Sequence, residues 1–128
     1  MNFILDTSAI LAAILAEPGG ESVTDKLGGS AVSTVIVAEV YTFASRNAHP
    51  LEPYAAFFDS QKVEIVPLTS ATAIAAGKMV AVTRSAGLSL GDRCCLALAQ
   101  ERQAAVLTAD RPWAQFADAL GIDIQVIR

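Results

Sequence analysis

The chain has 128 residues, the size of one domain, and we expect a single domain over residues 1–128. Apolar residues make up 53% of it and charged residues only 17%, which excludes an intrinsically disordered chain. The net charge of -4 excludes a general electrostatic attraction to nucleic acid, so such a partner would need local Arg residues and a bound cation.

Short strands alternate with helices along the whole chain. In chain order, we expect a strand over 2–5, a helix over about 8–17, a second helix to 27, a strand over 31–33, a helix over 34–46, a helix opened by Pro50 and Pro53, a strand over 63–67, helices over 70–85 and 89–102, a strand over 105–107, a short helix over 112–120 and a final strand over 124–127. This alternation predicts an α/β fold with a mainly parallel sheet covered on both faces.

The sequence also indicates the compartment. The longest unbroken apolar run, Ala9–Ala16, is far shorter than the roughly 20 residues of a membrane-spanning helix, and no basic segment precedes it as in a signal peptide. Cys94 and Cys95 are neighbours, which rarely form a structural disulfide bond. We therefore expect a reduced, cytoplasmic protein with no membrane partner. With His49 as the single histidine, carboxylates and hydroxyls are the groups left for chemistry.

Four acidic residues occupy positions that solvation does not explain. Asp6 and Asp110 come just after buried strands, where open α/β sheets place their ligands. Glu39 lies in the middle of an apolar helix, so it needs either an Arg partner or a metal ion. Asp92 lies at the start of the helix that carries Cys94. Capping is an alternative for three of them, since Asp6 and Asp110 can each cap a helix and Ser89–Asp92 fits a capping box.

If the four carboxylates converge, their mutual repulsion calls for a divalent cation. Ligands that are all oxygen select a hard ion, Mg²⁺ or Mn²⁺, which can activate water for attack on a phosphodiester. Thr7, Ser8 and Thr108 stand beside Asp6 and Asp110 and can orient a carboxylate or a metal-bound water, with helix capping or a local turn as the alternative. Arg93 and Arg111 can meet phosphate or be solvated.

These residues resemble the PIN-domain ribonucleases, and specifically the VapC-type toxins of type II toxin–antitoxin pairs. The opening Asp6-Thr7-Ser8-Ala9, the lone Glu39, the segment Leu88–Ala99 around Asp92, and Thr108-Ala109-Asp110 follow the order of that family over essentially the whole chain. The resemblance implies a three-layer, Rossmann-like α/β/α sandwich. It also implies a Mg²⁺- or Mn²⁺-dependent endoribonuclease that acts on RNA, forms a homodimer and is neutralised by a cognate VapB-type antitoxin. The ligands of the ion would be Asp6, Glu39 and Asp92, with Asp110 as the fourth acid.

Two other functions remain open at this point. In a non-enzymatic α/β binding module, the acids would act as helix caps and salt-bridge partners, and the apolar excess would serve assembly. A phosphoryl-transfer domain also begins with an Asp after the first strand. Here, however, Asp6 lacks a second Asp two residues on, and no Lys follows the strand over 105–107.

Overall fold

The computed structural model describes residues 2–128 and contains one five-stranded sheet in the order β3-β2-β1-β4-β5. All neighbouring strands are parallel. The strands are β1 (Phe3–Leu5), β2 (Ser30–Ser33), β3 (Val63–Val66), β4 (Ala105–Thr108) and β5 (Ile124–Val126). The first strand is central, so the segments that follow β1, β2 and β4 leave the sheet at the same edge.

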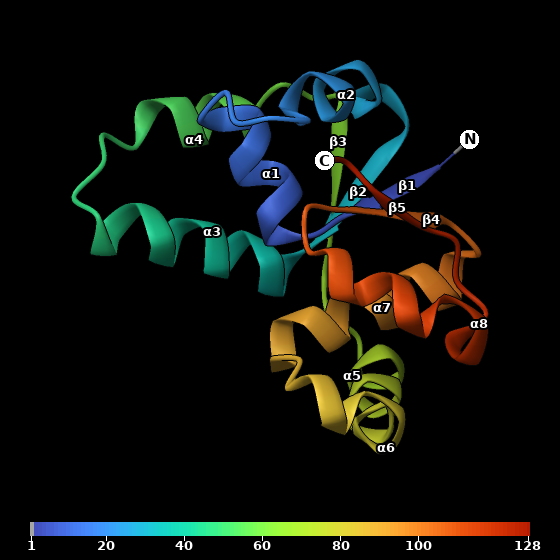
Figure 1. Cartoon of the computed structure of the whole chain (residues 1–128). Coiled ribbons are helices and arrows are strands. Elements are labelled where there is room, and N and C mark those ends of the chain that lie inside the picture. The colour runs from blue at the N-terminus through green and yellow to red at the C-terminus, as the bar shows by residue number, and fades with distance from the viewer. Residues whose placement is uncertain (1) are drawn as a thin grey trace.

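Helices cover both faces of this sheet. They are α1 (Thr7–Ile14), α2 (Gly20–Asp25), α3 (Thr34–Arg46), α4 (Glu52–Phe58), α5 (Ser70–Lys78), α6 (Val80–Thr83), α7 (Leu90–Arg102) and α8 (Ala117–Leu120), with short 3₁₀ turns η1 (Leu27–Gly29), η2 (Arg84–Ala86) and η3 (Arg111–Phe116). In Figure 1, α1 and α2 lie on one side of the sheet and α5, α6 and α7 on the other, while α3 and α4 form a hairpin that extends away from it. This arrangement confirms the predicted three-layer α/β/α fold.

The core lies where α7 crosses the sheet. The run Cys94–Ala99 is buried along its whole length, and α7 contacts β1, β2 and β4. Every residue of β1 and β4 is also buried. Strands that are covered on both faces are apolar throughout rather than alternating, which explains the short apolar runs in the sequence. No helix within residues 2–128 is long and apolar enough to cross a membrane.

Element boundaries differ from the prediction in a few places. The helix expected over 70–85 is divided at Met79, and its second half contains the β-branched residues Val80, Val82 and Thr83, which lower helix propensity. The first helix ends three residues early, at Ile14. Ser33 caps α3 by accepting a hydrogen bond from the Val35 amide.

Candidate functional site

The site begins with Asp6, whose carboxylate is buried at the end of β1. Its side chain accepts hydrogen bonds from the Ala9 amide (2.8 Å), the Thr108 hydroxyl (2.6 Å) and the Ser8 hydroxyl, which lies 2.8 and 2.9 Å from the two oxygens. The pKa of Asp6 is raised to about 6. Burial is the main cause and the nearby charge of Asp92 a smaller one, while these hydrogen bonds act in the opposite direction. Asp6 therefore caps α1, and it is also a carboxylate that is costly to ionise without a cation.

Glu39 lies between two other helices. Its Oε1 accepts a 2.8 Å hydrogen bond from the hydroxyl of Thr7 in α1. The same carboxyl group lies against Gly91 in the first turn of α7. From the sequence, Thr7 is expected to orient its neighbour Asp6. In the structure the Thr7 hydroxyl points to Glu39 instead, because successive residues at the start of a helix point in different directions.

Asp92 combines a capping role with proximity to Asp6. Its Oδ2 accepts a hydrogen bond from the Ser89 amide (2.9 Å), and the Asp92 amide donates to the Ser89 hydroxyl (3.1 Å), so the capping box is formed. The carboxylate is still close enough to Asp6 to raise its pKa. Asp92 can therefore cap α7 and also belong to an acidic site.

Three of the acids lie in the same region of the fold as the thiol of Cys95. Cys95 is buried, with Sγ 3.7 Å from the carbonyl oxygen of Leu5. Its pKa is raised well above the usual value, first by burial and then by the negative charges of Asp6, Asp92 and Glu39. The end of β1, the middle of α3 and the start of α7 thus bring their acids to the same part of the molecule.

Asp110 stands apart from these three. It is exposed after β4, and its side chain forms no cap of the following turn. Its backbone is nevertheless tied to the site, because the Asp110 amide donates to the Thr108 hydroxyl (2.9 Å) and the Ala109 amide donates to the Ser8 hydroxyl (2.8 Å). The side chain of Asp110 therefore does not form the N-cap that the sequence allows. Its carboxylate lies at the edge where the parallel strands end, but it faces solvent.

The acids are not neutralised by basic side chains. Among residues 2–128, the salt bridges join Arg102 to Glu64 and Arg128 to Glu17, and none involves the four acids. In the same residues, no three His, Cys, Asp or Glu side chains are yet close enough to coordinate one ion. The site is therefore a loose group of carboxylates, with oxygen donors only, and one of them is held at an elevated pKa.

The two arginines considered for phosphate are engaged elsewhere. Arg93 donates from Nη1 to the carbonyl oxygen of Ala76 in α5 (2.9 Å), and Arg111 donates from Nε to the carbonyl oxygen of Arg128 (2.9 Å). Both side chains thus fix neighbouring segments in place. The sequence shows only that each arginine follows an acid, and this position is equally consistent with phosphate binding and with a hydrogen bond to a neighbouring segment.

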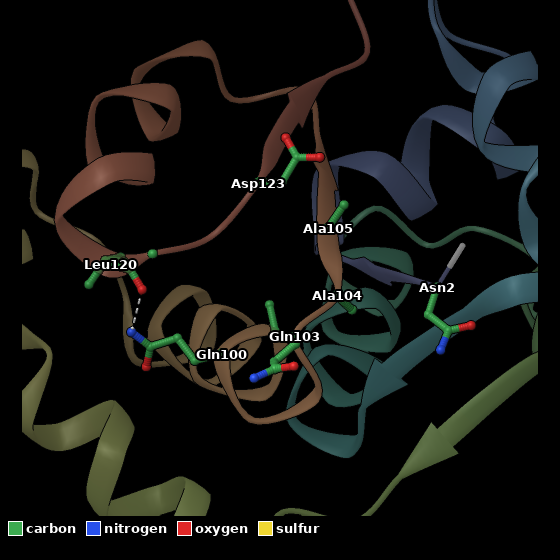
Figure 2. A pocket seen from close by; sticks show the side chains of 9 residues that line it. Asn2, Gln100, Gln103, Ala104, Ala105, Leu120 and Asp123 are labelled. Carbon is green, nitrogen blue, oxygen red and sulfur yellow. Dashed lines mark hydrogen bonds between the residues drawn. The ribbon is translucent and has the colours of Figure 1, made fainter.

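A pocket of about 730 Å³ lies at the other end of the sheet. Figure 2 shows that it is lined by Asn2, Ala105 and Asp123, which lie at the amino ends of the strands, and by Gln100, which donates a 2.9 Å hydrogen bond to the carbonyl oxygen of Leu120. The acids follow the carboxyl ends of the strands. This pocket is therefore separate from the acidic site, and its lining is mainly amide and aliphatic.

Comparisons with known proteins agree with this fold. The family model of the PIN domain matches residues 3–119. VapBC2 from Rickettsia felis, solved bound to a DNA fragment from its promoter, has a similar fold (TM-score 0.74, 16% identity, 100% of each chain covered). A toxin–antitoxin complex from Klebsiella pneumoniae is also similar (TM-score 0.72, 18% identity, 99% of this chain and 98% of that one). A comparison with curated proteins gave no match.

Proposed function

The chain belongs to the PIN domain family, and on that premise we propose that it is a metal-dependent endoribonuclease, the VapC-type toxin of a toxin–antitoxin pair. The observation that supports the proposal is the placement of three acids in one region of the fold. Asp92 is near enough to Asp6 to raise its pKa, and Glu39 lies against Gly91, the residue before Asp92. None of the three is paired with a basic side chain within residues 2–128. Uncompensated carboxylates at this edge of a parallel sheet are the expected arrangement of a cation-dependent site.

The donor set fits Mg²⁺ or Mn²⁺. It offers carboxylate and hydroxyl oxygens and no histidine, which is the preference of a hard ion. Asp6, Glu39 and Asp92 would hold the ion, and Asp110 would be the fourth acid. The elevated pKa of Asp6 fits as well, because a cation supplies the charge that burial of this carboxylate lacks. When bound, such an ion activates water for attack on a phosphodiester and offsets the negative charge of the phosphate.

The residues around the acids would keep them in position. Thr7 holds Glu39, while Ser8 and Thr108 hold Asp6. These hydroxyls limit the rotation of the carboxylates, which lowers the entropic cost of collecting them around one ion. Asp110, exposed after β4, would approach the ion from the solvent side.

A binding module without catalytic activity is the second candidate, and one observation favours it. Asp6 and Asp92 both cap helices, so these two residues have a structural role with or without a metal. Glu39 distinguishes the two candidates, since it caps nothing and has Thr7 as its hydrogen-bond donor. A binding module should give no specific heat in a titration with Mn²⁺, and its Tm should not rise with the metal.

RNA cleavage with and without chelator tests the proposal directly. Glu39→Gln should reduce cleavage at least about 100-fold while the far-UV circular dichroism stays unchanged. The matched control is Glu21→Gln, which changes an exposed helical glutamate in α2 and should cleave as the wild type does. Full activity of the Glu39→Gln protein, or cleavage that survives EDTA, contradicts the proposed mechanism.

The proposed partners are a VapB-type antitoxin and a second copy of the chain. Similar structures are described as toxin–antitoxin complexes, which supports the antitoxin. The apolar helices α1 and α3 direct buried residues into the core. Large apolar side chains that remain exposed belong to other segments: Leu51, Ile65, Leu68, Ile74, Val80, Val82 and Leu90. Sedimentation equilibrium should show a dimer, and co-expression with the antitoxin should relieve growth inhibition.

A further inference from the structure

Gly91 lies directly against the carboxyl group of Glu39. A Cβ atom placed on Gly91 would be 2.6 Å from Oε1 and closer still to Cδ and Oε2. Real Cβ atoms essentially never approach other atoms so closely. Any side chain at position 91 would therefore occupy the space in which the carboxylate of Glu39 now lies.

The backbone does not explain a glycine at this position. Gly19, Gly87 and Gly121 have positive φ angles, a conformation that favours glycine, whereas Gly91 is part of the regular helix α7. Glycine lowers the stability of a regular helix relative to alanine. What position 91 requires is space, and the atoms that fill this space belong to Glu39.

The carboxylate is also held by α1. Thr7 donates a 2.8 Å hydrogen bond to Oε1, so the half-buried Glu39 contacts both α1 and α7. Because the Glu39 side chain is flexible, a methyl group at position 91 would displace the carboxylate rather than unfold the helix. The displaced carboxylate would lose its hydrogen bond from Thr7 and its position against the first turn of α7.

We infer that Gly91 is a positioning residue for metal binding, an inference that rests on the proposed function. By leaving space on α7, Gly91 allows the carboxylate of Glu39 to lie against the first turn of the helix that carries Asp92, so that carboxylates from α3 and α7 can share one ion. The residue itself does not touch the ion or the substrate.

Titration calorimetry with Mn²⁺ tests the inference without an activity assay. Gly91→Ala should weaken the binding of Mn²⁺ at least about tenfold, the usual cost of losing a group that orients a ligand. The matched control is Gly77→Ala in α5, another helical glycine, around which a Cβ would meet nothing within 4 Å. This control should bind Mn²⁺ as tightly as the wild type.

A thermodynamic cycle in metal-free buffer tests the contact itself. In the wild type, Gly91→Ala gains helix propensity but loses the Thr7–Glu39 hydrogen bond, so its Tm should change little. In a Glu39→Ala background there is no carboxylate to displace, so Gly91→Ala keeps its gain in helix propensity. It should therefore raise the Tm by about 3 °C more than it does in the wild type. In a Glu39→Gln background the amide has the size of the carboxylate, so the Tm should again change little.

Two results would overturn the inference: a Mn²⁺ affinity of the Gly91→Ala protein within twofold of the wild type, or an equal effect of Gly91→Ala on Tm in all three backgrounds. Failure of the proposed function is recognised separately, because the wild type would then show no Mn²⁺ binding. The metal-free cycle would in that case still decide whether Gly91 makes room for Glu39.

Discussion

The carboxylate of Asp6 accepts a 2.6 Å hydrogen bond from the hydroxyl of Thr108, a residue 102 positions later in the chain. The two residues end neighbouring parallel strands, β1 and β4, and both side chains are buried. Thr108 also accepts a hydrogen bond from the Asp110 amide. One hydroxyl group therefore joins the buried acid of the site to the loop that carries the exposed one.

Removal of this hydroxyl should destabilise the protein. Thr108→Val keeps the shape of the side chain but leaves the Asp110 amide without its acceptor and removes one of the donors to the buried Asp6 carboxylate, which should cost about 2–3 kcal/mol of unfolding free energy. Thr108→Ser keeps the hydroxyl and should cost only about 1 kcal/mol for the lost methyl group. Urea unfolding of the three proteins provides the comparison, and equal losses for valine and serine would show that the hydrogen bonds contribute nothing.

The elevated pKa of Asp6 makes the stability of the metal-free protein depend on pH. Between the ordinary value of 3.8 and about 6, the folded protein binds a proton that the unfolded chain has released. Stability should therefore fall as the pH rises through this range, by on the order of 2–3 kcal/mol, and stay low above it.

Asp6→Asn should cancel this dependence. The amide carries no charge, so the variant should be more stable than the wild type at pH 8, by about 1–2 kcal/mol, and should lose this advantage at pH 4. Thermal unfolding in chelator at both pH values gives the measurement. If the Asp6→Asn protein is less stable than the wild type by the same amount at pH 4 and at pH 8, burial does not raise the pKa of Asp6.

Metal binding should release a proton near pH 6. An ion held by Asp6 requires its ionised form, so at pH 6 binding should release about half a proton per ion from this group, and almost none at pH 8. Calorimetric titrations with Mn²⁺ in buffers of different ionisation enthalpy measure this number. The same release at both pH values would exclude Asp6 as the group that titrates.

Thr7 should matter for activity more than for stability. Thr7→Val removes the hydrogen bond that holds Glu39, and we expect about a tenfold loss of RNA cleavage with less than about 1.5 kcal/mol of destabilisation. Thr42→Val is the matched control, because the Thr42 hydroxyl donates to the Ala38 carbonyl on the exposed side of α3. If both variants cleave RNA equally, the orientation of Glu39 by Thr7 is unimportant.

The sequence by itself determined the alternation of strands and helices and the positions of the acids within it. The central strand β1 is apolar over its whole length, and β4 is apolar up to Thr108, because both faces of these strands are covered. Helix ends carry caps such as Ser89 that are visible locally. Such signals lie within a few residues of one another. Parallel strands then place the residues that follow them at one edge, so Asp6 and Asp110 could be assigned to the same side of the sheet.

Only the tertiary structure decided which groups meet at that edge. Thr7 points to Glu39 rather than to its neighbour Asp6, and Asp110 faces solvent although it follows a buried strand. The space that Gly91 provides also became visible only once α7 was packed against α3. These relationships depend on the relative rotation and approach of helices that are distant in the chain, and local sequence periodicity carries no information about either.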